Sequence, residues 1–400
     1  MICQFSFQNF RSYKNETVFD MQATSAPEMS DSLIATNGGS PILPISVVYG
    51  PNGGGKSNLI KAFSALISMV VRPIHELKKN QNPIIFQYQS PCTPFAFDET
   101  SAQNPTEFLL YFRTRSHEYQ YFISVLRDTV ISESLHYKPI GGRMSKLFER
   151  EDGQITLGAK IRKAGVNTDI NEKMPYLSFL AINHNFPAIV EAQRWFESCV
   201  ILNYANPSTE QMLLLSEDSD FKNHIIQLLN DMGIDVTSYR FDEQLGNFFL
   251  THQIHGKDYE LALGNESEGT QKLFSVLPIV LLALAQGRPL LIDELDSKLH
   301  PKLLKYIISL FKNTAINHYG AQLIFSSHDM TTMRNDVFRR DEIWFASLTE
   351  NRDSEIYSLY EIRREGGQRI NNDAAYNIQY MAGRYGADPY LRAMLDWEAV

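Results

Sequence analysis

The sequence predicts an α/β fold in which a mixed, mostly parallel sheet is joined by an antiparallel β-subdomain and a helical insertion. Three observations support this prediction. The β-branched run 45–49 leads through a glycine-rich loop into a helical pattern at 58–70. In the second half of the chain, buried strand patterns alternate with helical patterns, which is typical of a parallel sheet. Between these regions, 108–113, 119–125 and 129–138 have the composition of three antiparallel strands separated by polar turns.

The composition is that of an ordinary globular protein. The chain has 400 residues, of which 44% are hydrophobic and 21% are charged, and its formal net charge of −9 argues against a large nucleic-acid footprint. Three widely separated cysteines show no disulfide or metal-binding spacing. The longest apolar run, 276–285, is too short to span a bilayer, and the N-terminus lacks a signal-peptide pattern. We therefore expect a cytoplasmic protein that has no membrane partner.

The remaining elements follow from periodicity. We expect a strand at 2–7, a surface loop with little regular structure at 22–44, and only loops and short elements at 140–175. Further helices and strands are expected, in chain order, at 176–199 (helical), 221–232 (helix), 272–286 (helix), 289–295 (strand), 301–313 (helix), 321–328 (strand), 341–348 (strand) and 356–362 (strand). These elements form one head with three parts: an N-terminal lobe (1–200) with the glycine-rich loop and the meander, a helical insertion or lid (201–250), and a C-terminal lobe (251–400).

The loop between the first buried strand and its helix has the pattern G-x-x-x-x-G-K-S. In this context the pattern predicts a phosphate-binding P-loop, because glycines let backbone N–H groups face the phosphates and the helix adds its positive dipole end. Lys56 would reach the outer phosphates, and the Ser57 hydroxyl would hold Mg²⁺. The expected nucleotide contacts are Gly50, Pro51, Asn52, Gly53, Gly54, Gly55, Lys56, Ser57 and Asn58.

Two acidic residues end the apolar strand 290–292. The carboxyl ends of buried parallel strands are where such sheets bind ligands. We expect Asp293 to hold Mg²⁺, directly or through water, and Glu294 to act as the general base that polarises the attacking water. His328 follows a second buried strand, 323–325, and is expected to contact the γ-phosphate.

The segment 265–270 precedes the apolar helix and contains Ser267 and Gly269. A hydroxyl and backbone N–H groups at a helix N-terminus can bind an anion. On local sequence alone, however, an ordinary helix-capping box is the better explanation.

The order of these motifs resembles that of ABC-type ATPase heads, especially the SMC/RecF-like branch: P-loop, S-x-G before a helix, an apolar strand ending in Asp-Glu, then His. The resemblance implies ATP and Mg²⁺ as cofactors and a homodimer, or multiples of it, with ATP sandwiched between subunits. It also implies that Ser267 and Gly269 act in trans and that Asp296 communicates across the dimer. Phe10-Arg11-Ser12 is similar to the N-terminal motif of that branch, whose Arg approaches the nucleotide; for the Q-loop, Gln87 and Gln89 are the candidates.

A narrower resemblance runs nearly end to end. The strings GPNGGGKSNL, IDELDSKLHP, RRDEIWF and YMAGRYGADP are similar to a prokaryotic ATP-binding family that includes the AbiL and RloA types, which are components of phage-defence systems. It implies an ATPase whose dimer state controls a separately encoded, nuclease-like effector. Gly54 stands where Ser or Ala is common in that family and Ser327 where Thr is common, and neither change is expected to prevent ATP hydrolysis.

Other functions remain as alternatives. A RecF-like repair ATPase would bind duplex DNA directly, with the basic segments 160–163 and 143–146 as candidate phosphate contacts. A transporter subunit is disfavoured by the long insertion and the short signature. A nuclease of the overcoming-lysogenization type is disfavoured because about seventy residues after His328 are too few for a further domain of ordinary size.

Overall fold

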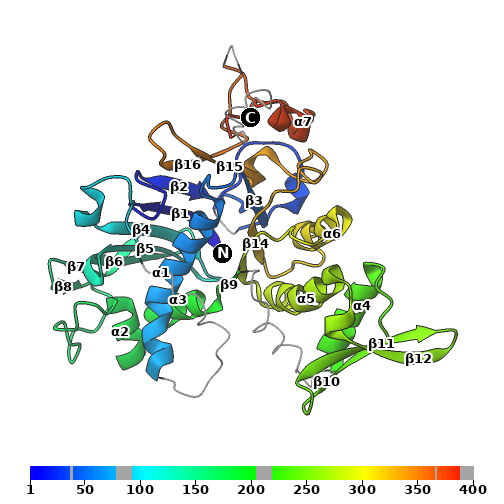
Figure 1. Cartoon of the computed structure of the whole chain (residues 1–400). Helices are drawn as coiled ribbons and strands as arrows, with labels where there is room; N and C mark the ends of the chain where they lie inside the picture. The colour runs from blue at the N-terminus through cyan, green and yellow to red at the C-terminus, as the bar shows by residue number, and fades with distance from the viewer. Residues whose placement is uncertain (37–38, 78–91, 204–218, 365–366, 388–400) are drawn as a thin grey trace, which may run out of the picture.

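The computed structural model describes residues 1–36, 39–77, 92–203, 219–364 and 367–387 (Figure 1). The described residues form three β-sheets. The predicted fold class is confirmed: a mixed, mostly parallel sheet is joined by an antiparallel sheet, and helices pack on both. The two Gln residues predicted for the Q-loop, Gln87 and Gln89, lie outside the described residues.

The central sheet has six strands in the order β16-β15-β3-β14-β13-β9. All neighbours are parallel except β15 and β16, which pair antiparallel. The strands, in chain order, are β3 (Ile45–Tyr49), β9 (Val200–Asn203), β13 (Pro289–Asp293), β14 (Gln322–Ser326), β15 (Ile343–Leu348) and β16 (Ser354–Ser358). The parallel strands place the P-loop after β3 and the Asp-Glu pair after β13 at the same edge of the sheet.

Alternate residues of the central strands face two different cores. In β13, Leu291 packs with the core around α1 (Lys56–Leu77), whereas Leu290 and Ile292 pack with the core around α5 (Glu268–Gln286) and α6 (Pro301–Lys312). Figure 1 shows α1 on one side of the sheet and α5 and α6 on the other. Burial on both faces explains why these strands are continuous apolar runs.

The predicted antiparallel meander belongs to a seven-stranded sheet in the order β2-β1-β4-β5-β6-β7-β8. The strands are β1 (Ile2–Gln8), β2 (Thr17–Asp20), β4 (Thr106–Arg113), β5 (His117–Leu126), β6 (Thr129–Pro139), β7 (Ser145–Glu151) and β8 (Gln154–Leu157). Its inner face shares one core with α1, α2 (Tyr176–Asn183) and α3 (Pro187–Ser198). The P-loop helix α1 is therefore packed between two sheets, and Phe63 on it contacts Phe5 at a ring-centroid distance of 4.0 Å.

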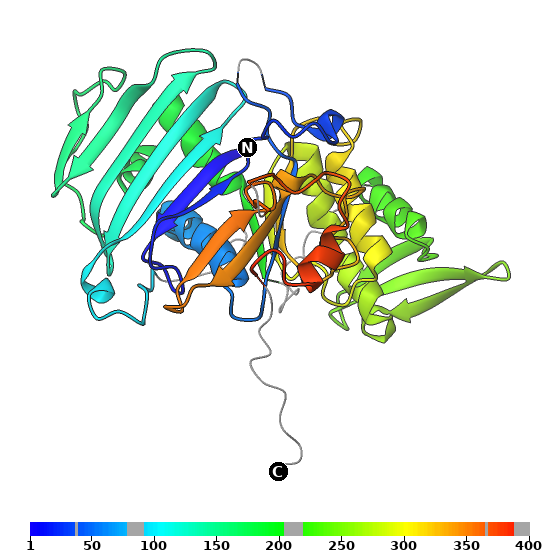
Figure 2. The same cartoon turned by 90° about the horizontal axis from the view of Figure 1, so that it is seen from above.

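The third sheet was not predicted. It consists of β10 (Ser238–Asp242), β11 (Asn247–Ile254) and β12 (Lys257–Ala262), and it projects from the end of the molecule opposite the seven-stranded sheet (Figure 2). Its buried face packs on α5 beside α4 (Ser219–Asp231), with Phe248 against Phe274 at 5.6 Å. The stretch 201–250 is thus not purely helical, because α4 is followed there by two strands.

The segment 22–44 was predicted to be a surface loop, and this prediction is wrong in part. It holds only a short 3₁₀ helix (Ser30–Ser32) and isolated bridges, but Ile42 and Leu43 are fully buried. Glu28 pairs with Arg340 at 2.8 Å, and Thr24 donates through Oγ1 to Asp341 at 2.7 Å. These ion pairs and hydrogen bonds attach the segment to the residues that precede β15.

Three further 3₁₀ turns and a last short helix complete the described elements. They are Ser101–Gln103, Leu263–Asn265, Arg340–Glu342 and α7 (Tyr376–Met381). Two of the helices, α1 and α5, have the length and composition that a membrane span requires, but 61% and 67% of their apolar windows are buried inside the protein. Both are core helices by that measure.

Candidate nucleotide-binding site

The P-loop packs against the backbone of β15. Gly50, Gly53 and Gly55 have φ angles of +144°, +80° and +115°, which side-chain-bearing residues rarely adopt. A Cβ at Gly50 would overlap the carbonyl oxygen of Ala346, and one at Gly54 would lie 2.7 Å from the same oxygen. A side chain at Gly54 would therefore collide with the backbone of β15.

Lys56 is held inside the loop. Its Nζ donates to the carbonyl oxygens of Gly50 at 2.9 Å and Pro51 at 3.0 Å, and the residue is only 6% exposed. Burial lowers the pKa of Lys56, and the nearby carboxylates of Asp293, Glu294 and Asp296 oppose that change. The ammonium group is thus fixed between the P-loop backbone and the acidic end of β13.

The two predicted magnesium ligands are adjacent. The Ser57 hydroxyl donates to Asp293 Oδ1 at 3.1 Å, and the Ser326 hydroxyl donates to the same oxygen at 2.5 Å. A hydroxyl and a carboxylate beside a phosphate-binding loop are the hard oxygen donors that Mg²⁺ prefers. The donor set therefore fits the predicted ion. Ser326, which sequence analysis did not single out, fixes the carboxylate from the end of the neighbouring strand.

Glu294 is exposed next to this pair and has an unusual backbone. Its φ of +53° lies in the left-handed region, which costs a non-glycine residue of order 1–3 kcal/mol. Its backbone N–H donates to Ser326 Oγ at 2.7 Å. The conformation turns the chain sharply after β13, so that Asp293 and Glu294 occupy separate positions at the edge of the sheet.

Asp296 and His328, which were predicted to have separate roles, are hydrogen-bonded to each other. Asp296 Oδ2 accepts from the backbone N–H of His328 at 2.9 Å. The other oxygen, Oδ1, is buried and has no hydrogen-bond partner within the described part of the chain. The His328 side chain is exposed at the carboxyl end of β14, beside β3 and the P-loop.

Ser267 and Gly269 lie at the N-terminus of α5. Ser267 is its N-cap and accepts from the backbone N–H of Thr270 at 3.1 Å, so the capping function is present. A Cβ on Gly269 would meet no atom closer than 3.4 Å, which leaves its backbone approachable. No hydrogen bond or ion pair between described residues joins either of them to the P-loop of the same chain.

The N-terminal motif supports the P-loop from its other side. Arg11 has a φ of +52°, and its backbone N–H donates to the Thr93 carbonyl at 2.7 Å. The Asn58 side chain donates to Ser12 Oγ at 2.8 Å, so this predicted nucleotide contact binds the supporting loop in this structure. Tyr13 donates to the Gly55 carbonyl at 3.2 Å. Sequence analysis missed Tyr13, although it directly follows the motif.

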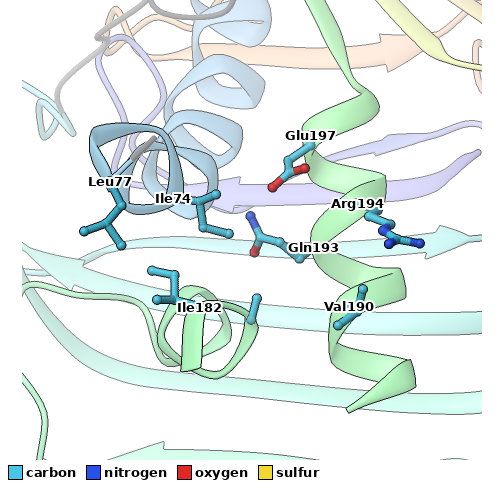
Figure 3. A pocket seen from close by; sticks show the side chains of 8 residues that line it. Ile74, Leu77, Ile182, Val190, Gln193, Arg194 and Glu197 are labelled. Atoms are coloured by element: carbon cyan, nitrogen blue, oxygen red, sulfur yellow. The ribbon is translucent and has the colours of Figure 1, made fainter. Parts of the chain in front are cut away.

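A separate cavity lies far from these residues. It has a volume of about 320 Å³ and lies between the last turn of α1, α2 and α3 (Figure 3). It is lined by Ile74, Leu77, Ala181, Ile182, Val190, Gln193, Arg194 and Glu197. Because a helix rises about 1.5 Å per residue, the 22-residue α1 separates this cavity from the P-loop by its whole length. It is not part of the nucleotide site.

A family model described as "AAA domain, putative AbiEii toxin, Type IV TA system" matches residues 45–334. This chain belongs to that AAA domain family. The match spans the P-loop, the Asp-Glu pair, the S-x-G segment and His328, and it leaves out Arg11. The predicted P-loop ATPase domain and its nucleotide-binding character are thereby confirmed.

The chain is also similar to solved structures, at low sequence identity. An SMC head bound to the C-winged helix domain of ScpA aligns at 12% identity and a TM-score of 0.39, covering 89% of this chain and 97% of that one. The recombination mediator protein RecF, in a structure titled RecF-ATPrS in the RecFOR pathway, aligns at 12% identity and a TM-score of 0.32, covering 89% and 98%. No curated protein sequence matches this member of the AAA domain family.

Proposed function

We propose that this AAA-family protein hydrolyses ATP and uses the nucleotide as a dimerisation switch that controls a separately encoded effector in phage defence. The observation that carries the proposal is the hydrogen bond from Ser57 to Asp293, at 3.1 Å, with Glu294 as the next residue. It brings together the ends of two strands, one carrying a phosphate-binding loop and the other carrying a carboxylate pair. That arrangement suits a phosphoryl-transfer site better than a site for binding alone.

The chain's own residues supply the steps of hydrolysis. The P-loop amides and Lys56 would hold the phosphates. Ser57 and Asp293 would hold Mg²⁺, which would supply charge neutralisation when bound. Glu294 accepts a proton from the attacking water as the water oxygen bonds to the γ-phosphorus. The bond from that phosphorus to the bridging oxygen then breaks, giving ADP and phosphate.

The proposed dimer rests on the S-x-G segment. Ser267 caps α5 and Gly269 lies in its first turn, and no hydrogen bond or ion pair between described residues joins either of them to the P-loop of their own chain. We therefore propose that they bind the ATP of a second copy. The N-terminus of α5 would offer a hydroxyl, backbone N–H groups and its dipole to the γ-phosphate of the partner's ATP. ATP would then hold two heads together. Because ATP would bind the dimer more tightly than the monomer, it would shift the equilibrium towards the dimer, as a switch requires.

The effector and the defence setting rest on the resemblance to the AbiL and RloA types. The description of the matched family, which mentions an AbiEii toxin, supports that setting. We infer a cytoplasmic ATPase that has a nuclease-like partner protein and no membrane partner. The substrate of that partner and the signal that starts hydrolysis are properties of the complex.

The deciding experiment uses Glu294→Gln. We expect this variant to bind Mg-ATP, to lose about 10²- to 10⁴-fold in turnover, and to accumulate as a dimer in native mass spectrometry. Glu243→Gln, an exposed change in the turn between β10 and β11 of the third sheet, is the control. A dimer that retains a second protein from the native host would identify the effector. Normal turnover of Glu294→Gln would exclude the assigned base.

A second candidate function, direct binding of duplex DNA, is favoured by one observation. The basic segments 143–146 and 160–163 lie together at one end of the seven-stranded sheet, since the Gly158 N–H donates to Leu147 at 2.8 Å and Ile161 donates to Gly158 at 3.1 Å. Lys160, Arg162 and Lys163 are exposed there. Salt-dependent duplex binding that a triple Lys160, Arg162, Lys163→Glu variant loses would support this function; binding that is absent in the unmodified protein would exclude it.

A further inference from the structure

Lys272 is a buried lysine in α5, the helix that Ser267 of the S-x-G segment caps. It lies five residues after Ser267, is the one basic residue of α5, and is only 4% exposed. A buried ammonium group is costly unless hydrogen-bonded partners compensate for its lost hydration. The groups that hydrogen-bond to the Lys272 amine therefore indicate which part of the protein this side chain holds in position.

The Lys272 ammonium group donates to the loop that follows β13. Its Nζ donates to the carbonyl oxygen of Glu294 at 3.2 Å and to that of Ser297 through a short hydrogen bond. Burial lowers the pKa of Lys272 to about 7, and the negative charges of Asp296 and Glu294 oppose this effect. The contacts therefore connect the signature helix to the backbone of the proposed general base.

The hydrogen bond from Lys272 holds the backbone carbonyl group of Glu294, the residue with the left-handed backbone. The Glu294 N–H is fixed by Ser326 Oγ at 2.7 Å, and its carbonyl is fixed by Lys272. Both peptide groups of a residue at φ +53° are thus anchored, one by β14 and the other by α5. A displacement of α5 relative to β14 would therefore strain these two hydrogen bonds.

We propose that Lys272 is a positioning residue through which engagement of the S-x-G segment by the partner's ATP sets the orientation of Glu294 in the same chain. The inference rests on the proposed dimer switch and deepens it. It connects the two ATP sites of a dimer, because the S-x-G segment belongs to one site and Glu294 of the same chain belongs to the other. Hydrolysis at one site then depends on ATP at the second.

The test compares Lys272→Met and Lys272→Gln, which lack the lysine amine that donates to the two carbonyl oxygens, with Lys272→Arg, which keeps a long side chain with N–H donors. We expect the first two to bind Mg-ATP with a dissociation constant within about threefold of the unmodified protein but to lose about 10- to 100-fold in kcat, since a small misplacement of a catalytic group has effects of that size. Lys272→Arg should restore most of the kcat. Lys302→Met, an exposed change on α6, is the control.

A second readout does not depend on turnover. In the unmodified protein, Mg-ATP should slow hydrogen exchange of the amides in 293–298, and in Lys272→Met and Lys272→Gln this protection should be lost while that of the P-loop amides remains. Protection of 293–298 that persists in a folded variant, or is absent from the unmodified protein, would overturn the inference. Absence of ATP turnover in the unmodified protein would instead overturn the proposed function. Melting temperatures identify the variants that fold. The test needs only one of Lys272→Met and Lys272→Gln to fold.

Discussion

The Lys56 side chain is hydrogen-bonded to the backbone of its own loop, and these hydrogen bonds determine the expected effect of replacing Lys56. Lys56→Ala should abolish nucleotide binding, because the two carbonyl oxygens of Gly50 and Pro51 that now accept from Nζ would be left facing the phosphates. We expect at least a 100-fold weaker affinity for a fluorescent ATP analogue, about 2.7 kcal/mol. Lys61→Ala, further along α1, is the control and should bind normally. Retained binding by Lys56→Ala would contradict the P-loop assignment.

Gly54 gives a steric prediction. Gly54→Ala should lower stability by about 1–3 kcal/mol and weaken ATP binding, because the new Cβ would lie 2.7 Å from the Ala346 carbonyl and β15 must move to admit it. Gly264→Ala is the matched control, since a Cβ there meets no atom within 4 Å. Chemical denaturation measures the difference. Equal midpoints for the two variants would refute the close packing of β15 on the loop.

The pKa of Lys272 predicts a pH dependence of stability. Its folded pKa, about 7, lies below the ordinary value of 10.5, so between these values the unfolded chain binds a proton that the folded chain does not. Stability should therefore rise with pH from about 7 towards 10.5, by an amount on the order of a few kcal/mol. The difference in unfolding free energy between the unmodified protein and Lys272→Met, measured across that range, isolates the effect. A pH-independent difference would contradict it.

At the scale of elements, a buried ion network attaches the segment 22–44 to the start of β15. Arg339 is fully buried and forms two hydrogen bonds to Asp341, at 2.8 and 2.9 Å. Arg339→Ala should cost roughly 3–5 kcal/mol of unfolding free energy, because it leaves a buried carboxylate without its counter-charge. Arg334→Ala, which breaks the exposed pair with Asp336, should cost less than about 1 kcal/mol. Similar costs for both would refute the network's role.

Elements with strong local signals were predictable from sequence. The helix α5 is an example: Ser267 caps it, and Gly287, at φ +66°, ends it after Gln286, the last residue of the predicted helix 272–286. The small sheet β10–β12 was missed although Tyr259 and Leu261 alternate with charged residues in its edge strand β12, which is exposed along nearly its whole length. Its stability comes from packing on Phe274, which the sequence of the strands does not reveal.

The candidate site was predictable in its motifs but not in its supports. Lys56, Ser57, Asp293 and Glu294 follow from local patterns, and the parallel sheet brings them together. Ser326 and Lys272 matter through contacts with residues distant in sequence, at 2.5 and 3.2 Å. The one local signal for Lys272 is a cation within an apolar helical pattern. The roles of Ser267, Gly269 and Asp296 in a dimer stay predictions.

At the scale of the whole molecule, the P-loop depends on segments beyond the matched span 45–334. Tyr13 bonds to Gly55 at 3.2 Å, and β15 pairs with β3. A protein truncated to 45–334 should therefore fail to unfold cooperatively or bind ATP, because it loses β1, β2, β15 and β16. Circular dichroism melting with and without Mg-ATP checks this against the full chain. A cooperative transition that ATP raises would show that the terminal segments are dispensable.

The position of α1 between two sheets has a consequence for regulation. Its first residue, Lys56, contacts the phosphate-binding loop, while Phe63 packs in the core of the seven-stranded sheet. A partner that bound that sheet and displaced α1 would be expected to change nucleotide affinity. Thermodynamic reciprocity then requires the nucleotide to alter the grip of that protein by the same factor. The seven-stranded sheet is thus a surface through which a bound partner would be coupled to the ATP site, and nucleotide binding would in turn change the affinity of that partner.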